Sequence, residues 1–280
     1  KALGRGAPPC RYALLVLGSA GRGESLLAMD QDNALVFAEG APDSLNDQWF
    51  AELGSHVADI LHEVGVPYCP GGVMASRPAF RGSMDVWRGR FANWVSRSNP
   101  EDLLSSDITY DFRAVHGDLA MAAELRAAAW AEARHAIPFL KLLAVNGEGG
   151  ESAFTLFGGF RTDEQGRIDL KNVGLRKIVT AARVLALRHG VVRHSTQDRI
   201  AGLLEMDIGG DADFKLMDRA HCVVLDAILR QQVADIAAGR PPSNRIDPKG
   251  LGKEGAKTLK DALSGLSAID DMVRSQLTGT

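Results

Sequence analysis

The chain has 280 residues, of which 32 are basic and 35 acidic, and its formal net charge is −3. Hydrophobic residues make up 45% and charged residues 24% of the sequence, which is ordinary for a globular protein and excludes disorder as its main state. The near-neutral charge argues against a duplex nucleic-acid partner, and the lack of any long apolar run argues against a membrane partner.

The three cysteines, Cys10, Cys69 and Cys222, lie far apart in the sequence. They form neither a disulfide framework nor a zinc-binding pattern, which fits a reducing compartment. We therefore expect a cytoplasmic protein.

The first 118 residues mix predicted strands and helices. Short, continuous apolar runs predict buried strands, and apolar residues at helical spacing predict helices. Residues 67–76, rich in glycine and proline, indicate a loop that is either a plain turn or a mobile binding loop. In chain order, the other predicted elements are a strand over 12–17, a short helix over 21–27, a strand over 33–37, helices over 45–64 and 83–96, and an alternating, half-buried strand over 107–115.

From residue 119 onward the pattern is mainly helical. The change of character near residue 118 predicts two domains, 1–118 and 119–280. The predicted fold class is α+β, with a small mixed sheet followed by a mainly α-helical domain. The predicted elements of the second part are helices over 119–135, 174–189, 196–206, 212–238 and 253–278, and a hairpin-like insert formed by 154–160 and 167–170.

A glycine-rich turn after the first strand is suited to holding phosphates. It is not a Walker loop, because Glu24 stands where the lysine must be, and its glycine order differs from the dinucleotide fingerprint. Gly18 and Gly21 let the backbone approach a phosphate, and Ser19 adds a hydroxyl at a helix start. Arg22 is either a further phosphate contact or one half of a solvent-facing pair with Glu24.

Asp30 and Asp32 enter the second predicted strand together. Residues i and i+2 of an extended segment point to the same side, so these carboxylates lie about 7 Å apart. Such pairs are common on protein surfaces, but two carboxylates repel each other unless a cation lies between them. Hard oxygen ligands at this spacing suit Mg²⁺.

Asp111 is the best candidate for a third carboxylate, on the polar face of the predicted strand over 107–115. Arg113 shares that face and can steady a carboxylate or a phosphate. Three carboxylates can hold two metal ions, which activate an attacking oxygen and stabilise a departing pyrophosphate. The sequence thus predicts Asp30, Asp32 and Asp111 as catalytic metal ligands.

The combination resembles the nucleotidyltransferases of the DNA polymerase β superfamily. Gly18-Ser19, ten intervening residues, Asp30-x-Asp32 and the later Asp111-Phe-Arg113 carry this resemblance. The chain is similar in particular to a bacterial group in which the domain usually follows CBS and cyclic-nucleotide-binding-like domains, and which is related to the uridylyltransferase of the signalling protein PII. Further segments that resemble this group are Cys69–Ser76, Gly117-Asp118, Ile168–Lys171, Ala182–Leu187 and Gln232–Asn244.

The resemblance implies a polymerase-β-like nucleotidyltransferase domain followed by a helical substrate-binding domain. By family, Asp30, Asp32 and Asp111 would ligate two Mg²⁺ ions, with Mn²⁺ as an alternative, while Gly18 and Ser19 would hold the phosphates of an NTP. The reaction would move a nucleoside monophosphate to an acceptor hydroxyl and release pyrophosphate, in signal transduction. By the same analogy the acceptor is a protein. CBS or cyclic-nucleotide-binding regulatory domains would precede this region in a longer chain. The resemblance is also compatible with a homo-oligomer.

The alternative hypothesis is a catalytically weak nucleotide-binding regulatory module. In that case the chain senses a nucleotide without transferring it. A template-dependent polymerase is disfavoured by the small size and the net negative charge.

Overall fold

The computed structural model describes residues 6–100, 103–148, 152–155 and 158–278. The chain forms two compact units, the first comprising Lys1–Ser25 and Met29–Phe139, the second Leu26–Ala28 and Leu140–Thr280. The predicted boundary lay near residue 118. The first unit extends further because helix α5 (Leu119–Arg134) packs against helix α3 (Met84–Arg97) and the sheet.

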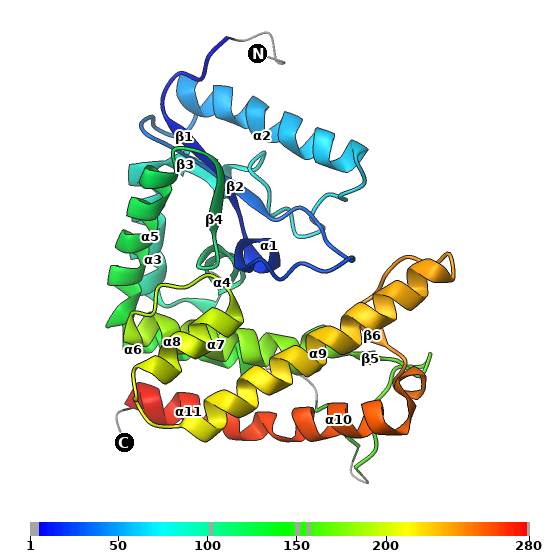
Figure 1. Ribbon diagram of the computed structural model, residues 1–280. Helices are drawn as coiled ribbons and strands as arrows, with labels where there is room; N and C mark the ends of the chain where they lie inside the picture. The colour runs from blue at the N-terminus through cyan, green and yellow to red at the C-terminus, as the bar shows by residue number, and fades with distance from the viewer. Residues whose placement is uncertain (1–5, 101–102, 149–151, 156–157, 279–280) are drawn as a thin grey trace. The chain divides into compact units, whose positions relative to one another are not determined.

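A small mixed sheet lies at the centre of the first unit, as the sequence predicted (Figure 1). Strand β1 pairs antiparallel with both β2 and β4, and β2 pairs parallel with β3, so the order is β3-β2-β1-β4. The strands are β1 (Tyr12–Val16), β2 (Asn33–Phe37), β3 (Arg81–Ser83) and β4 (Arg113–Gly117).

Helices cover both faces of this sheet. Helix α2 (Leu45–Glu63) lies on one side, and α3 and α5 lie on the other (Figure 1). All five residues of β2 are therefore buried. On the α2 side, Leu35, Phe37, Phe50 and Ala75 form a core cluster in which the rings of Phe37 and Phe50 stack 4.6 Å apart.

The aromatic residues of α3 belong to the core. Trp87, Phe91 and Trp94 are buried, and the indole N–H of Trp87 donates to the Leu35 carbonyl at 3.0 Å. Their helical spacing reflects packing in the core.

The predicted strand over 107–115 is wrong over residues 107–112. Residues Leu103–Thr109 form helix α4, and extended structure begins only at Arg113. The Tyr110 amide donates to the Ser106 carbonyl at 3.1 Å, which is a helical i to i+4 bond. Tyr110 and Phe112 are buried although the segment between helix and strand is not extended, so the apolar alternation mimicked a strand.

The short helix expected over 21–27 lies earlier. It is α1 (Gly18–Arg22), because the Gly21 amide donates to the Leu17 carbonyl and the Glu24 amide to the Ser19 carbonyl. In the first unit, a 3-10 turn, η1 (Pro78–Phe80), precedes β3.

The second unit is mainly helical, as predicted. Its largest element, α9 (Asp211–Ala237), presents a buried stripe that includes Phe214, Met217 and Val224. Its other elements are α6 (Ile137–Glu148), whose first residues belong to the first unit, a π-helical turn η3 (Lys171–Leu175), α7 (Arg176–His189), α8 (Thr196–Glu205), a 3-10 turn η4 (Pro248–Leu251), α10 (Gly252–Ser264), α11 (Leu266–Thr278), and the ribbon of β5 (Ile168–Asp169) and β6 (Arg245–Ile246).

Two predictions in this unit are wrong in detail. Residues 168–169 pair with 245–246 rather than with 154–160, where Phe154 and Phe160 instead form a bridge with each other. The helix predicted over 253–278 is two helices that meet at Gly265. The break lets α10 pack on α9 while α11 packs on α7 and α9.

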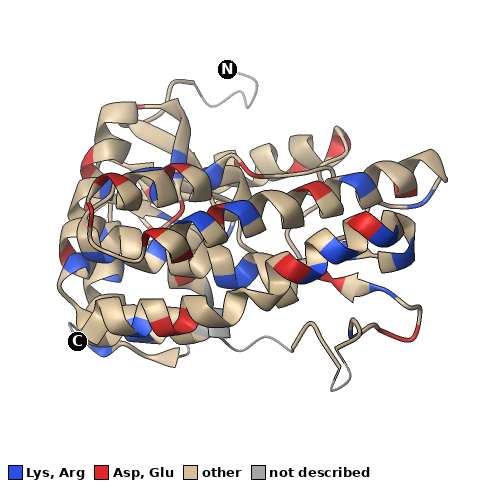
Figure 2. Ribbon diagram, turned by 60° about the horizontal axis from the view of Figure 1, so that its bottom comes forward, with Lys and Arg blue, Asp and Glu red and all other residues tan. Residues whose placement is uncertain are grey.

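Charged residues of both signs are interspersed along the helices (Figure 2). On α9, Arg230 lies 2.7 Å from Asp226 one turn earlier. Such exposed pairs contribute little to stability but keep the helix surface solvated. Among the described residues, no helix is long and apolar enough to cross a membrane.

Candidate functional site

The Asp30 and Asp32 carboxylates face away from the core because the residue between them faces inward. Gln31 is 3% exposed, and its amide donates to the carbonyls of Ala58 and Val66 at 2.8 and 2.9 Å. Successive side chains of an extended segment point to opposite sides. Burial of Gln31 therefore directs Asp30 and Asp32 outward, and both keep access to solvent.

The loop over residues 67–76 is bound to this segment by backbone contacts. The Asn33 amide donates to the Val73 carbonyl at 3.0 Å, and the buried Asn33 side chain accepts from the Ala75 amide at 2.9 Å. The loop noted in the sequence thus lies beside the carboxylates, and it brings Cys69 to them.

Asp30, Asp32 and Cys69 form one group, in which a ligand atom from each lies within 4.8 Å of the others. Burial raises the pKa of the Cys69 thiol, and a hydrogen bond to the Asp32 carboxylate raises it further. The sequence pattern predicts Asp30 and Asp32 in the site but not Cys69. The position of Cys69 in the glycine-rich loop was the feature that could have pointed to it.

The Gly-Ser turn borders the same carboxylates. The Leu17 amide donates to the Asp32 carbonyl at 2.9 Å, and a Cβ on Gly18 would lie 3.3 Å from an Asp32 carboxylate oxygen. Gly18 has a φ of +52°, which favours glycine. The hydroxyls of Ser19 and Ser25 lie 3.2 Å apart. The turn and the Asp-x-Asp pair are therefore neighbours, whereas phosphate binding by Gly18 and Ser19 stays a prediction.

Arg22 connects two carboxylates in a buried ion-pair group. Its guanidinium lies 2.7 Å from Glu24 and 2.5 Å from Asp111, and the three side chains are 9%, 8% and 0% exposed. Arg22 and Glu24 do form a pair, but the interpretation that this pair faces solvent is wrong. Phosphate contact by Arg22 stays a prediction, and the carboxylates already engage this guanidinium.

The segment around Asp111 is pressed against α1. A Cβ on Gly21 would come within 1.9 Å of the Asp111 carbonyl oxygen, so any side chain at Gly21 would displace one of the two segments. Arg113 donates to the carbonyls of Ala20 and Gly21 at 3.1 and 3.3 Å, at the negative end of α1. Arg113 thus holds the helix.

Asp111 is not brought into the group around Asp30. Among the residues that the structure describes, that group comprises Asp30, Asp32 and Cys69, and Asp111 is engaged by Arg22 instead. Metal ligation by Asp111 stays a prediction, and it would have to compete with the guanidinium.

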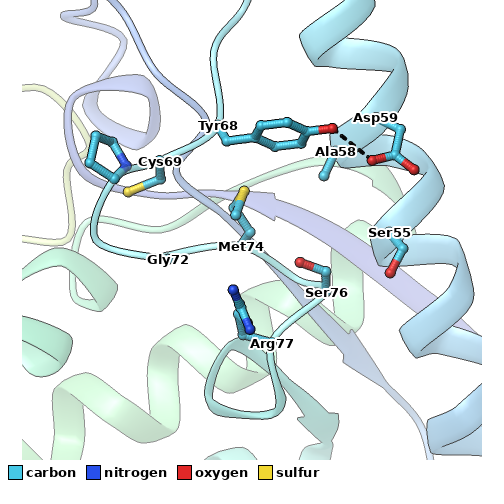
Figure 3. Close-up of a pocket in the computed structure, with 10 residues that line it drawn as sticks. Ser55, Ala58, Asp59, Tyr68, Cys69, Gly72, Met74, Ser76 and Arg77 are labelled. Atoms are coloured by element: carbon cyan, nitrogen blue, oxygen red, sulfur yellow. Dashed lines mark hydrogen bonds between the residues drawn. The ribbon is translucent and has the colours of Figure 1, made fainter.

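A cavity of about 540 Å³ adjoins the carboxylate group through Cys69 (Figure 3). It lies between α2 and the loop over 67–76, and its size is ordinary for a small-molecule site. Tyr68 donates to Asp59 at 2.9 Å, and this hydrogen bond raises the pKa of the phenol. Within the described part of the chain, the exposed Arg77 guanidinium lining this cavity has no carboxylate partner.

The donor set fits a divalent cation. Mg²⁺ and Mn²⁺ take a few carboxylate oxygens and complete their shells with water or phosphate oxygens. Asp30 and Asp32 offer such oxygens beside the Gly-Ser turn. The Cys69 thiol is a softer donor, which these hard ions do not require. Asp30 and Asp32 are thus the residues that would hold an ion.

Two family models match the chain. One, described as "Putative nucleotidyltransferase DUF294", matches residues 1–101, and the other, described as "Putative nucleotidyltransferase substrate binding domain", matches residues 137–277. The first includes Asp30, Asp32, Cys69 and Arg77, and the second includes the helices α7 to α11. No curated protein matches the chain.

Proposed function

The chain belongs to the nucleotidyltransferase family whose two models match it, and from this premise we propose that it moves a nucleoside monophosphate from an NTP to an acceptor hydroxyl in a metal-dependent reaction. The observation that carries the proposal is the grouping of Asp30 and Asp32 beside Gly18, within the region of the nucleotidyltransferase model.

Asp30 and Asp32 would hold Mg²⁺, with Mn²⁺ as the alternative, and a second ion would require Asp111. A bound divalent cation neutralises charge on the phosphates and on the attacking oxygen. The backbone of Gly18 and the Ser19 hydroxyl would orient the phosphates. The Arg77 guanidinium, which lines the adjoining cavity, supports the binding of an anionic substrate there.

The proposed step is a displacement at the α-phosphorus. The acceptor oxygen forms a bond to that phosphorus, the bond to the α–β bridging oxygen breaks, and pyrophosphate leaves with the bonding electrons. The hydroxyl proton passes to a carboxylate, for which Asp111 is the predicted base. In the form described here Arg22 engages Asp111, so this role requires the guanidinium to move.

That engagement favours a second candidate, a nucleotide-binding regulatory module with weak or no transfer. A carboxylate held by a buried guanidinium is a poor base and a poor metal ligand. The carboxylate pair would then serve binding of the nucleotide with its metal and not turnover.

A pyrophosphate-release assay separates the two candidates. Each NTP is incubated with Mg²⁺ or Mn²⁺ and with acceptors that include cell lysate, and binding is measured in parallel. Release with one NTP supports transfer, whereas tight binding without release for any acceptor supports the regulatory module.

Two double variants that remove the same charge test whether the Asp30 and Asp32 pair is the site of nucleotide and metal binding. Asp30→Asn with Asp32→Asn should abolish nucleotide binding in the presence of metal. Asp43→Asn with Asp85→Asn removes the same charge from exposed positions of the first unit and should leave binding unchanged. Unchanged binding in the Asp30 and Asp32 variant would contradict both candidates.

The biological setting is proposed from the resemblance to the group with CBS and cyclic-nucleotide-binding-like domains. We place the activity in cytoplasmic signal transduction, with regulatory domains preceding this region and a protein as acceptor. Mass spectrometry of lysate proteins after incubation with labelled NTP tests this setting. Label found only on small molecules would contradict the protein acceptor.

A further inference from the structure

Helix α9 holds a stretch from the beginning of the chain through one buried side chain. Gln232 is 0% exposed, and its amide oxygen accepts from the backbone amides of Leu27 and Ala28 at 2.8 and 3.3 Å. Its amide nitrogen donates to the Asn244 side chain at 3.0 Å. Both ends of the Gln232 amide are therefore paired, which sets the orientation of its oxygen toward Leu27.

The stretch that Gln232 holds joins the two halves of the candidate site. Leu26–Ala28 belongs to the second compact unit, whereas Ser25 before it and Met29 after it belong to the first. Ser25 lies beside Ser19 of the Gly-Ser turn, and Met29 directly precedes Asp30. The stretch is in neither a helix nor a strand, so no regular backbone pairing fixes it.

We propose that Gln232 is a positioning residue for the Asp30 and Asp32 carboxylates. By accepting from Leu27 and Ala28, it fixes the point from which the chain enters the Asp-x-Asp segment. Gln232 lies in the region matched by the substrate-binding domain model, and Leu26–Ala28 belongs to the same compact unit as Gln232. The consequence for metal binding rests on the proposed function, whereas the consequence for backbone order does not.

The test compares the same substitution at neighbouring positions of α9. Gln232→Met keeps the size of the side chain and removes its acceptor oxygen. Gln231→Met is the control, because Gln231 bonds to Asp235 and to the Asp247 amide and has no bond to Leu26–Ala28.

Amide hydrogen exchange is the first readout. Gln232→Met should lose protection at Leu27 and Ala28 and also at Gln31 and Asn33, whose amides donate to the loop over 67–76. Gln231→Met should keep protection at all four. Loss at Leu27 and Ala28 alone, with Gln31 and Asn33 unchanged, would overturn the positioning role.

Binding of Mn²⁺ alone, measured by calorimetry, is the second readout. Residues that orient metal ligands typically change affinity by a factor of 10–100, so Gln232→Met should weaken Mn²⁺ binding about tenfold. Equal affinity in Gln232→Met and wild type would contradict the proposal. No Mn²⁺ binding in the wild type would instead contradict the proposed function, and hydrogen exchange would still decide the positioning role.

Leu27→Pro tests the contact from its other side. Proline has no amide hydrogen, so this variant removes the shorter bond and leaves α9 intact, even if Gln232→Met does not fold. It should reproduce the loss of protection at Gln31 and Asn33. Where both variants fold, their effects on Mn²⁺ affinity should not add, because they remove one interaction. Additive effects, or full protection in Leu27→Pro, would overturn the proposal.

Discussion

Two carboxylate regions border helix α1 and differ in their access to water. Asp30 and Asp32 keep access to solvent, and buried Gln31 holds their segment from behind. Asp111 is buried and lies against Arg22. Accessible carboxylates can accept a metal ion, whereas breaking a buried pair of a carboxylate and an arginine destabilises the fold. Access to solvent therefore distinguishes the two regions, although both carry aspartates.

The largest expected effect is the loss of turnover in Asp32→Asn. Divalent cations supply several kcal/mol of charge stabilisation in such reactions, so metal-dependent pyrophosphate release should fall about a thousandfold. The free energy of unfolding should change much less, which urea titration measures. Asp85→Asn, at an exposed position on α3, is the control. Activity retained in Asp32→Asn would contradict the expectation that the metal binds at Asp30 and Asp32 rather than at Asp111.

Asp111→Asn should have the opposite profile. It leaves the buried Arg22 and Glu24 without their third charge, and breaking such a buried pair costs about 3–5 kcal/mol. Urea unfolding measures this loss. Glu124→Gln, which breaks an exposed pair with Arg88, should cost about 1 kcal/mol or less.

The activity of Asp111→Asn tests whether Asp111 differs in role from Asp30 and Asp32. Pyrophosphate release per folded molecule that stays near wild type would make Asp111 a structural residue. Loss of release and of a second Mn²⁺ equivalent would make it the third ligand that the sequence predicts.

Gln31→Leu should weaken metal binding without touching a carboxylate. Leucine cannot donate to the Ala58 and Val66 carbonyls, so the segment that directs Asp30 and Asp32 should lose its orientation. We expect Mn²⁺ affinity to fall about tenfold in calorimetry. Gln48→Leu removes an exposed amide of α2 that donates to the Asp43 carbonyl, and it should leave the affinity unchanged. Equal effects of the two variants would argue against support by Gln31.

The smallest expected effect concerns acid stability at Asp118. Its bond from the Met121 amide, with help from Arg11, lowers the pKa of this carboxyl. A lowered pKa gives stability that is present above the unfolded value, about 3.9, and is lost as the pH falls through the folded value. Asp118→Asn should therefore flatten the loss of stability below about pH 4, measured by thermal melts. An unchanged pH dependence would show that this cap contributes nothing there.

Local patterns were sufficient for most elements of the first unit. The apolar runs at 12–17 and 33–37 became β1 and β2, and the helix predicted over 45–64 became α2. The segment 107–115 misled because Tyr110 and Phe112 are both buried without forming a strand. The residues that alternate with them, Thr109 and Asp111, are buried as well, so the alternation of apolar and polar residues did not reflect alternate burial in a strand.

The candidate site also contains residues that could be predicted from the sequence and residues that could not. Asp30 and Asp32 could be predicted because their relation depends on two residues of extended chain. Cys69 could not, because contacts between Asn33 and the residues Val73 and Ala75 bring it to the carboxylates. The pairing of Arg22 with Asp111 joins residues 89 positions apart, and no spacing rule reaches that far.

The sequence alone determined the Gly-Ser turn, the Asp-x-Asp pair, the order of a mixed domain and a helical domain, and the resemblance to nucleotidyltransferases. These features rest on local geometry, which a few neighbouring residues specify. Only the tertiary structure decided that Asp30 and Asp32 keep access to solvent and that the buried Asp111 pairs with Arg22. It alone also showed that Gln232 accepts hydrogen bonds from the stretch before Asp30. Burial and long-range hydrogen bonds depend on residues that are far apart in the chain, so they emerge only when it is folded.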